Sequence, residues 1–164
     1  MANTGGVFFL LFGISGLLTG AWSWPRFNDK AAGGCCPSGW TVLDDHCYIF
    51  QGEPRTFADA ESVCNILGGN LVSIRSYVDN LLVVGLVKEG GVDFAWIGLH
   101  DAIQLGDFLW TDGTDFDFNG FQFGEPDGTG VCVELYAADG TFFDEDCTVK
   151  HAYVCIRDRF CDGL

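Results

Sequence analysis

Residues 131–156, VCVELYAADGTFFDEDCTVKHAYVCI, decide the fold that this sequence predicts. The stretch holds two strand fragments, VCVELY and AYVCI, which glycine and aspartate turns separate. Three of its residues belong to a series of cysteines with irregular spacing: Cys36, Cys47, Cys64, Cys132, Cys147 and Cys155. The chain has 8 cysteines in all, an even number, and in a chain with an export signal this favours a disulfide framework over metal clusters or catalytic thiols.

An apolar run at residues 7–18, VFFLLFGISGLL, precedes this framework. The run has the length of a signal-peptide core and is shorter than the ~20 residues of a membrane-spanning helix. Small residues at Thr19 and Ala21 suit cleavage after Ala21, although no Lys or Arg precedes the run. The sequence therefore predicts a signal peptide over 1–21, with an uncleaved anchor as the alternative, then a linker over 22–34. The mature protein is expected to be secreted and extracellular, without membrane insertion.

The charge of the chain limits its partners. It has 8 Lys and Arg against 23 Asp and Glu, and because all of them follow the apolar run, the mature chain carries the whole net charge of −15. Nucleic acid and anionic membrane surfaces are poor partners for such a chain. Cations, mineral surfaces and neutral ligands such as sugars suit it better.

Two helices are predicted upstream of the decisive stretch. Thr56 is a plausible N-cap for an amphipathic helix over 56–67, which Gly68 and Gly69 end. A second, more apolar helix is expected over 76–88.

The remaining upstream segments predict strands and one long loop. Short strands are expected at 40–42, 47–50 and 71–74 and in the fragments FAWIGL and FLWTD. Residues from about 112 to 130 show no regular pattern, and a long irregular loop in a compact domain is usually functional.

The sequence predicts no enzyme. His46, His100 and His151 are isolated and have no zinc-ligand spacing. No nucleophile elbow, phosphate loop or dinucleotide fingerprint occurs in the mature chain. One set of aromatic residues in strand-like positions is expected in the core: Phe94, Trp96, Phe108, Trp110 and Tyr153.

Several short motifs occur in a fixed order: Gly39-Trp40, Trp96-Ile97-Gly98-Leu99, Trp110-Thr111-Asp112-Gly113 and Gly124-Glu125-Pro126-Asp127. Together with the spaced cysteines, they resemble the C-type lectin-like domain over residues 36–157. The resemblance implies an α+β fold over 35–161, in which two helices flank small antiparallel sheets. It also implies a long loop that binds calcium and ligand, and a disulfide-braced framework.

The resemblance implies three disulfide pairs: Cys64 with Cys155, Cys132 with Cys147, and Cys36 with Cys47. Cys35 and Cys161 are left over. Because this fold brings its termini together, a bond between these two cysteines is expected. Covalent dimerisation through either of them is the alternative, so a homodimer or a larger oligomer stays open.

In this family the long loop holds one calcium ion, and a sugar completes the coordination of that ion. The Glu-Pro-Asp triplet supplies Glu125 and Asp127, and its proline is usually cis in the family; a plain surface turn is the alternative. The family's Trp-Asn-Asp motif ends here at Asp144, whereas Phe143 replaces its asparagine and Gly130 stands where another acid is usual. Glu125, Asp127 and Asp144 are therefore the predicted ligands for calcium and sugar, three of an expected five.

Other acidic residues near the loop are weaker candidates for calcium ligands. Glu145 and Asp146 could replace the missing ligands or could form a solvated turn. A second calcium site found in some relatives is predicted to be absent, because Leu105 and Gly128 replace its acids, and Asp101 is then a turn residue.

The predicted function is a secreted, calcium-dependent lectin that binds carbohydrate or glycoprotein glycans on microbes, gametes or other cells. Its sugar specificity stays open, because both Glu125 and Asp127 supply only acceptors where the family pairs one carboxylate with one amide. The alternative is a protein of the same fold that binds no sugar and acts on a mineral, a matrix, ice or a protein partner. The missing ligands at Phe143 and Gly130 favour this alternative.

Overall fold

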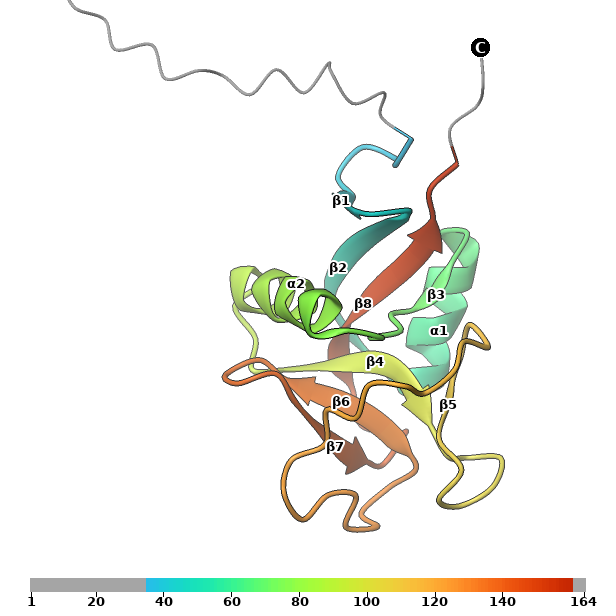
Figure 1. Cartoon of the computed structure of the whole chain (residues 1–164), viewed down its shortest axis with the longest axis vertical. Coiled ribbons are helices and arrows are strands. Elements are labelled where there is room, and N and C mark those ends of the chain that lie inside the picture. Colours follow the sequence, from blue (N-terminus) through green and yellow to red (C-terminus); the bar gives the residue numbers. More distant parts are fainter. Residues whose placement is uncertain (1–34, 161–164) are drawn as a thin grey trace, which may run out of the picture. The chain divides into compact units, whose positions relative to one another are not determined.

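The computed structural model of the chain describes residues 35–160, so the predicted signal peptide and linker lie outside the described residues. Helices and strands follow one another in the order β1 (Thr41–Leu43), β2 (His46–Arg55), α1 (Phe57–Ile66), β3 (Asn70–Leu71), α2 (Tyr77–Glu89), β4 (Phe94–His100), β5 (Leu109–Trp110), β6 (Cys132–Tyr136), β7 (Thr141–Glu145) and β8 (His151–Asp158) (Figure 1). The predicted α+β class is confirmed. Neither helix in this part of the chain is long and apolar enough to cross a membrane.

The strands form one mixed sheet with the order β1-β2-β8-β4-β6-β7, to which β3 adds at β8 and β5 adds at β4. The pairs are antiparallel except for β4 and β8, which run parallel. The expectation of small antiparallel sheets therefore differs from the structure in this respect. The last strand returns between β2 and β4, so it joins the β1-β2 hairpin to the β4-β6-β7 part that lies lowest in Figure 1.

Both helices begin where the sequence predicts them. The side chain of Thr56 accepts a hydrogen bond from the amide of Asp59, and the side chain of Ser76 does the same for Asp79, as N-caps do. Gly68 follows α1 with a φ of +86°, a conformation that favours glycine.

The strand predicted at 71–74 is shorter in the structure. Only Asn70–Leu71 joins the ladder of β8. Val72 instead donates to Val154 on β8 and accepts from Gly98 on β4, so this residue bridges two strands and ends the regular pairing. In contrast, β2 continues past the predicted 47–50 to Arg55.

The sheet buries an apolar core on each face, because successive side chains of a strand point to opposite sides. On β4, Ala95 and Ile97 face the core that includes Val83 of α2. Trp96 faces the other core, which includes Phe57 of α1. Of the aromatic set expected in the core, Trp96, Trp110 and Tyr153 are buried and Phe94 and Phe108 are half-buried.

Within residues 35–160 the structure shows the three disulfides that the resemblance implies: Cys36–Cys47, Cys64–Cys155 and Cys132–Cys147. The second joins α1 to β8 across 91 residues, and in the chain-entropy description a loop of that length stabilises by about 4–5 kcal/mol. The bond expected between Cys35 and Cys161 stays a prediction, since Cys161 lies outside the described residues.

Phenylalanines hold the long loop between β5 and β6 against the sheet. Phe118 and Phe121 each lie 6.1 Å, centroid to centroid, from the ring of Phe142, which is fully buried on β7. The backbone of Phe142 also donates to Gly120 and accepts from Gln122. The loop is therefore irregular in conformation yet attached to β7 by side chains and backbone.

Candidate functional site

The three predicted ligands lie together where the long loop meets the end of β7. Glu125 and Asp127 come from the loop and Asp144 from the strand, and one carboxylate oxygen of each lies within 4.8 Å of the others. The Glu125–Pro126 peptide is cis, and Gly124 and Gly128 flank the triplet with φ values of +99° and +84°. Because L side chains rarely adopt these φ values, glycine suits both positions.

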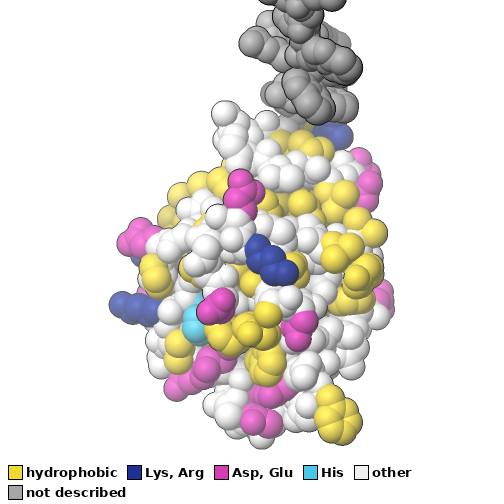
Figure 2. Space-filling view, turned by 90° about the vertical axis from the view of Figure 1, so that its left-hand side faces the viewer, with side chains coloured by type: hydrophobic (Ala, Val, Ile, Leu, Met, Phe, Trp, Pro, Cys, Tyr) yellow, Lys and Arg dark blue, Asp and Glu magenta, His cyan; other side chains and the backbone are white. Residues whose placement is uncertain are grey.

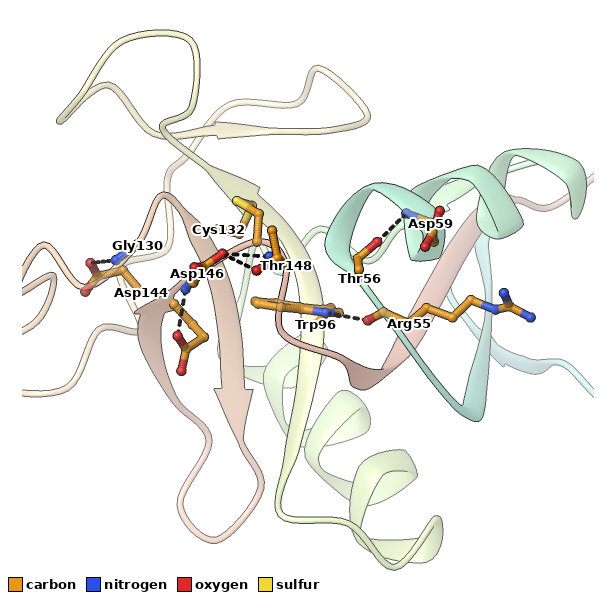
Figure 3. The surroundings of a disulfide bond; sticks show 11 residues. Arg55, Thr56, Asp59, Trp96, Gly130, Cys132, Asp144, Asp146 and Thr148 are labelled. Atoms are coloured by element: carbon orange, nitrogen blue, oxygen red, sulfur yellow. Dashed lines mark hydrogen bonds between the residues drawn. A yellow bond between two sulfur atoms is a disulfide. The ribbon is translucent and has the colours of Figure 1, made fainter.

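Asp144 is the centre of this arrangement. Its Oδ1 accepts a hydrogen bond from the amide of Asp127 at 2.8 Å, and its Oδ2 accepts from the amides of Gly128 and Gly130 at 2.9 and 3.1 Å. Figure 3 shows the carboxylate turned toward the backbone of Gly130. One buried carboxylate, 4% exposed, thus receives three backbone N–H groups from the loop.

Thr129 completes the local hydrogen bonding and is not among the residues predicted for this site. Its hydroxyl donates to the backbone carbonyl of Asp144 at 2.6 Å, and its amide donates to Oδ1 of Asp127 at 3.0 Å. The run Asp-Gly-Thr after the proline could have indicated this, because aspartate side chains often accept from the amide two residues later in turns.

The pKa values of two of the carboxylates are shifted in opposite directions. Burial raises the pKa of Glu125, and the neighbouring carboxylates of Asp144 and Asp127 raise it further. Burial would also raise the pKa of Asp144, but hydrogen bonds from the amides of Gly130, Asp127 and Gly128 outweigh it and hold that pKa below its ordinary value. Asp144 is therefore the group that stays ionised, and Glu125 is the one that retains a proton more readily.

The residues fit a hard cation. Oε2 of Glu125 is enclosed and has no hydrogen-bond partner among the described residues. Calcium is bound by carboxylate oxygens, and waters can fill the rest of its six to eight positions. A cation here would give the unpartnered oxygen a ligand and would offset the repulsion among three acids.

The structure gives physical reasons for the two missing ligands. A Cβ at Gly130 would lie 1.8 Å from the carbonyl oxygen of Glu145, so the strand end leaves no room for a side chain. Phe143 faces the other side of the sheet, where its ring lies 6.3 Å from that of Phe94 and 6.2 Å from that of Tyr136. Neither position supplies an oxygen ligand from its side chain.

The other acids near the loop do not replace these ligands. Asp146 accepts from the amide and hydroxyl of Thr148, both at 2.8 Å, and so forms the turn that was one of the two expectations (Figure 3). The carboxylate of Glu145 lies close to Glu134 and His151 instead, within 4.8 Å of a ligand atom of each.

Asp101 lies in the turn in which it was expected. Its Oδ2 accepts from the amide of Gly106 at 2.7 Å.

Known proteins resemble this chain over most of its length. Residues 53–157 match the model of the Lectin C-type domain. The chain is 30% identical over 134 residues to the galactose-specific lectin nattectin of Thalassophryne nattereri, and the aligned region covers 79% of this chain and 84% of the relative. It is 35% identical over 123 residues to the type-2 ice-structuring protein of Hemitripterus americanus, which covers 73% of each. The crystal structure of human lithostathine matches with a TM-score of 0.70 and 32% identity, over 75% of this chain and 90% of that chain.

The close approach at Gly130 can be tested by adding one methyl group. We expect Gly130→Ala to lower the free energy of unfolding by about 1–3 kcal/mol, because the loop and the strand end must separate. Gly85→Ala is the matched control, since a Cβ at that position of α2 meets no neighbouring atom within 4 Å. The control should be neutral or stabilising by about 0.5–1 kcal/mol in urea denaturation. Equal stability of the two variants would contradict the close approach.

The bonding of Asp144 predicts a structural role that needs no metal ion. In chelator, Asp144→Ala should lower the free energy of unfolding by about 2–4 kcal/mol, because three amide groups lose their acceptor. Asp139 is a suitable control, since it accepts two hydrogen bonds from Thr141 at an exposed turn. Asp139→Ala should cost no more than about 1 kcal/mol. If urea midpoints of the two variants coincide, the amides around Asp144 are satisfied by water.

Proposed function

The chain belongs to the C-type lectin domain family, and on this premise we propose that it is a secreted, calcium-dependent carbohydrate-binding protein. Proteins of this family are binding proteins and not enzymes, in agreement with the sequence analysis. We place the domain at 35–161, after a signal peptide at 1–21 and a linker at 22–34. Glu125, Asp127 and Asp144 would hold one calcium ion and contact the sugar.

One observation carries this proposal. Three carboxylates from two separate segments converge within 4.8 Å, and an enclosed oxygen of Glu125 has no hydrogen-bond partner in the described part of the chain. Like charges this close destabilise one another unless a proton or a cation lies between them. Calcium suits an all-oxygen set, and with three protein ligands we expect the weak affinity of extracellular modules, with a Kd of about 0.1–1 mM.

The surface charge of the domain and one side chain near the site suit a neutral ligand. Acidic side chains are spread between apolar ones over the face drawn in Figure 2, with few Lys or Arg among them. Phe123 is fully exposed and precedes the triplet by two residues, so its ring can pack against the apolar face of a sugar ring. The hydroxyl groups of the sugar would donate to Glu125 and Asp127, because both side chains accept only.

A second candidate function has its own observation. Three large apolar side chains of the loop region are exposed: Ile103 is 78% exposed, Leu105 79% and Phe123 100%. Exposed apolar side chains suit ice or a protein partner, and one relative is named an ice-structuring protein. The acidic surface of the chain would suit a mineral or a matrix. In this alternative Asp144 acts only as a structural acceptor, and Glu125 and Asp127 hold no sugar.

Calcium titration tests the metal part of the proposal. We expect one equivalent of calcium to bind the chelator-treated mature chain in calorimetry and to raise its melting temperature. Asp127→Ala removes an exposed ligand with little effect on folding and should weaken binding at least tenfold, which is about 1.4 kcal/mol. Asp139→Ala removes an exposed acid elsewhere and should leave the affinity unchanged. If calorimetry detects no calcium binding by the unaltered chain, the proposed metal site is excluded and the second candidate function is favoured.

Changing one atom type in the triplet tests the sugar part. In the family a Glu-Pro-Asn order goes with mannose-type sugars and a Gln-Pro-Asp order with galactose-type sugars. We therefore expect Asp127→Asn to strengthen binding to immobilised mannose and Glu125→Gln to strengthen binding to galactose, both in millimolar calcium. Each change restores one amide donor beside one carboxylate acceptor. Calcium binding without any sugar binding in all three proteins, together with inhibition of crystal growth, would support the second candidate instead.

A further inference from the structure

We propose a second metal site, for a transition-metal dication such as Zn²⁺, formed by Glu134, Glu145 and His151. The three residues come from β6, β7 and β8, and one ligand atom of each lies within 4.8 Å of the others. In the sequence His151 is an isolated histidine, because Glu134 and Glu145 are separated from it. This site does not rest on the proposed calcium site.

The backbone places the two sites on opposite faces of the sheet. Asp144 and Glu145 are consecutive on β7, so their side chains point to opposite sides. Glu134 pairs with Phe143 across the β6-β7 ladder, and Cys132 pairs with Glu145. Glu134 and Glu145 are therefore diagonal neighbours on one face, away from Asp144.

Aromatic packing holds His151 near this pair. Strand β4 lies between β8 and β6, and two of its side chains flank the imidazole. The His151 ring meets Trp96 edge-to-face at 4.9 Å and lies 6.2 Å from Phe94, centroid to centroid. Trp96 is itself fixed, because its Nε1 donates to the carbonyl of Arg55 at 2.9 Å (Figure 3). The imidazole thus reaches across β4 toward Glu134 in a preformed position.

The glutamate at the centre is buried, and its Oε2 forms no hydrogen bond within residues 35–160. The Glu134 side chain is only 8% exposed, and its Oε2 lies 2.8 Å from Nε2 of His151. Both atoms are enclosed, and apart from this close contact neither has a partner among the described residues. Within residues 35–160 neither glutamate forms a salt bridge with Lys or Arg. Burying an ionised carboxylate is costly unless a positive charge or hydrogen bonds offset the lost hydration, so Glu134 needs a counter-charge.

The donor set indicates the kind of ion. One imidazole and two carboxylates suit Zn²⁺ and its first-row neighbours, whereas calcium takes oxygen ligands alone. Two ligand atoms on one such ion lie about 2.9 Å apart when they meet at right angles and about 3.4 Å apart in a tetrahedron. The Nε2 and Oε2 atoms, at 2.8 Å, need only a small shift to share an ion. Oε1 of Glu145 accepts a hydrogen bond from the amide of Asp146, so the other carboxylate oxygen of Glu145 is the one available to the ion.

The test is calorimetric titration of Zn²⁺ into the chelator-treated, disulfide-intact mature chain in the presence of millimolar calcium, which occupies an all-oxygen site. We expect one equivalent of Zn²⁺ to bind, and Co²⁺ to give visible absorption bands in its place. Glu145→Ala, at a half-exposed position, and His151→Gln should each weaken Zn²⁺ binding by about 10–100-fold or more. Melting curves in chelator show whether each variant is folded.

Two control variants separate this site from other ligands. Among the described residues, His100 is half-buried, its enclosed Nδ1 also lacks a hydrogen-bond partner, and it belongs to no such cluster. His100→Gln should therefore bind Zn²⁺ as the unaltered chain does, and so should Asp127→Ala. Absence of Zn²⁺ binding, or binding that survives in folded Glu145→Ala and His151→Gln, would overturn the proposal and leave Glu134 and His151 as a buried ion pair.

Discussion

The long loop stays in place because two residues on the same face of β7 hold it by different forces. Phe142 packs beneath the rings of Phe118 and Phe121, so the loop gains apolar burial. Asp144, two residues further on, accepts three backbone amides from the end of the loop. An irregular segment needs such partners, because its own backbone supplies no ladder of hydrogen bonds. The convergence of Glu125 and Asp127 on Asp144 depends on both contacts.

Local chemistry made much of the fold predictable. Thr56 and Ser76 start helices because their side chains accept amides that no helical turn can satisfy, and this signal lies within a few residues of sequence. The parallel pairing of β4 with β8 could not be predicted in this way, since it joins residues far apart in the chain. The grouping of Glu134, Glu145 and His151 depends on that pairing and on the β6-β7 register, so it was hidden for the same reason.

In the predicted site, too, some features follow from local sequence and others only from the folded structure. A short motif and its distance from a cysteine carry over between related chains, so the sequence predicts Glu125, Asp127 and Asp144 together, and the structure brings their carboxylates close to one another. Gly130 was read as a missing ligand, but the structure shows a close approach of its backbone to that of Glu145. The same residue donates its amide to Asp144. Sequence alone reports only which side chain is absent; the neighbouring strand explains why none fits.

The two ends of the described chain, at β1 and at the end of β8, lie at the upper end of the domain in Figure 1, whereas β7, whose Asp144 meets the Glu-Pro-Asp turn, lies at the lower end. Anything joined to either end therefore leaves the Glu-Pro-Asp turn facing outward. Two such domains held together by their ends would present paired loops to one surface. The second contact would then be intramolecular, and a weak monovalent site would gain avidity without any change in its own residues.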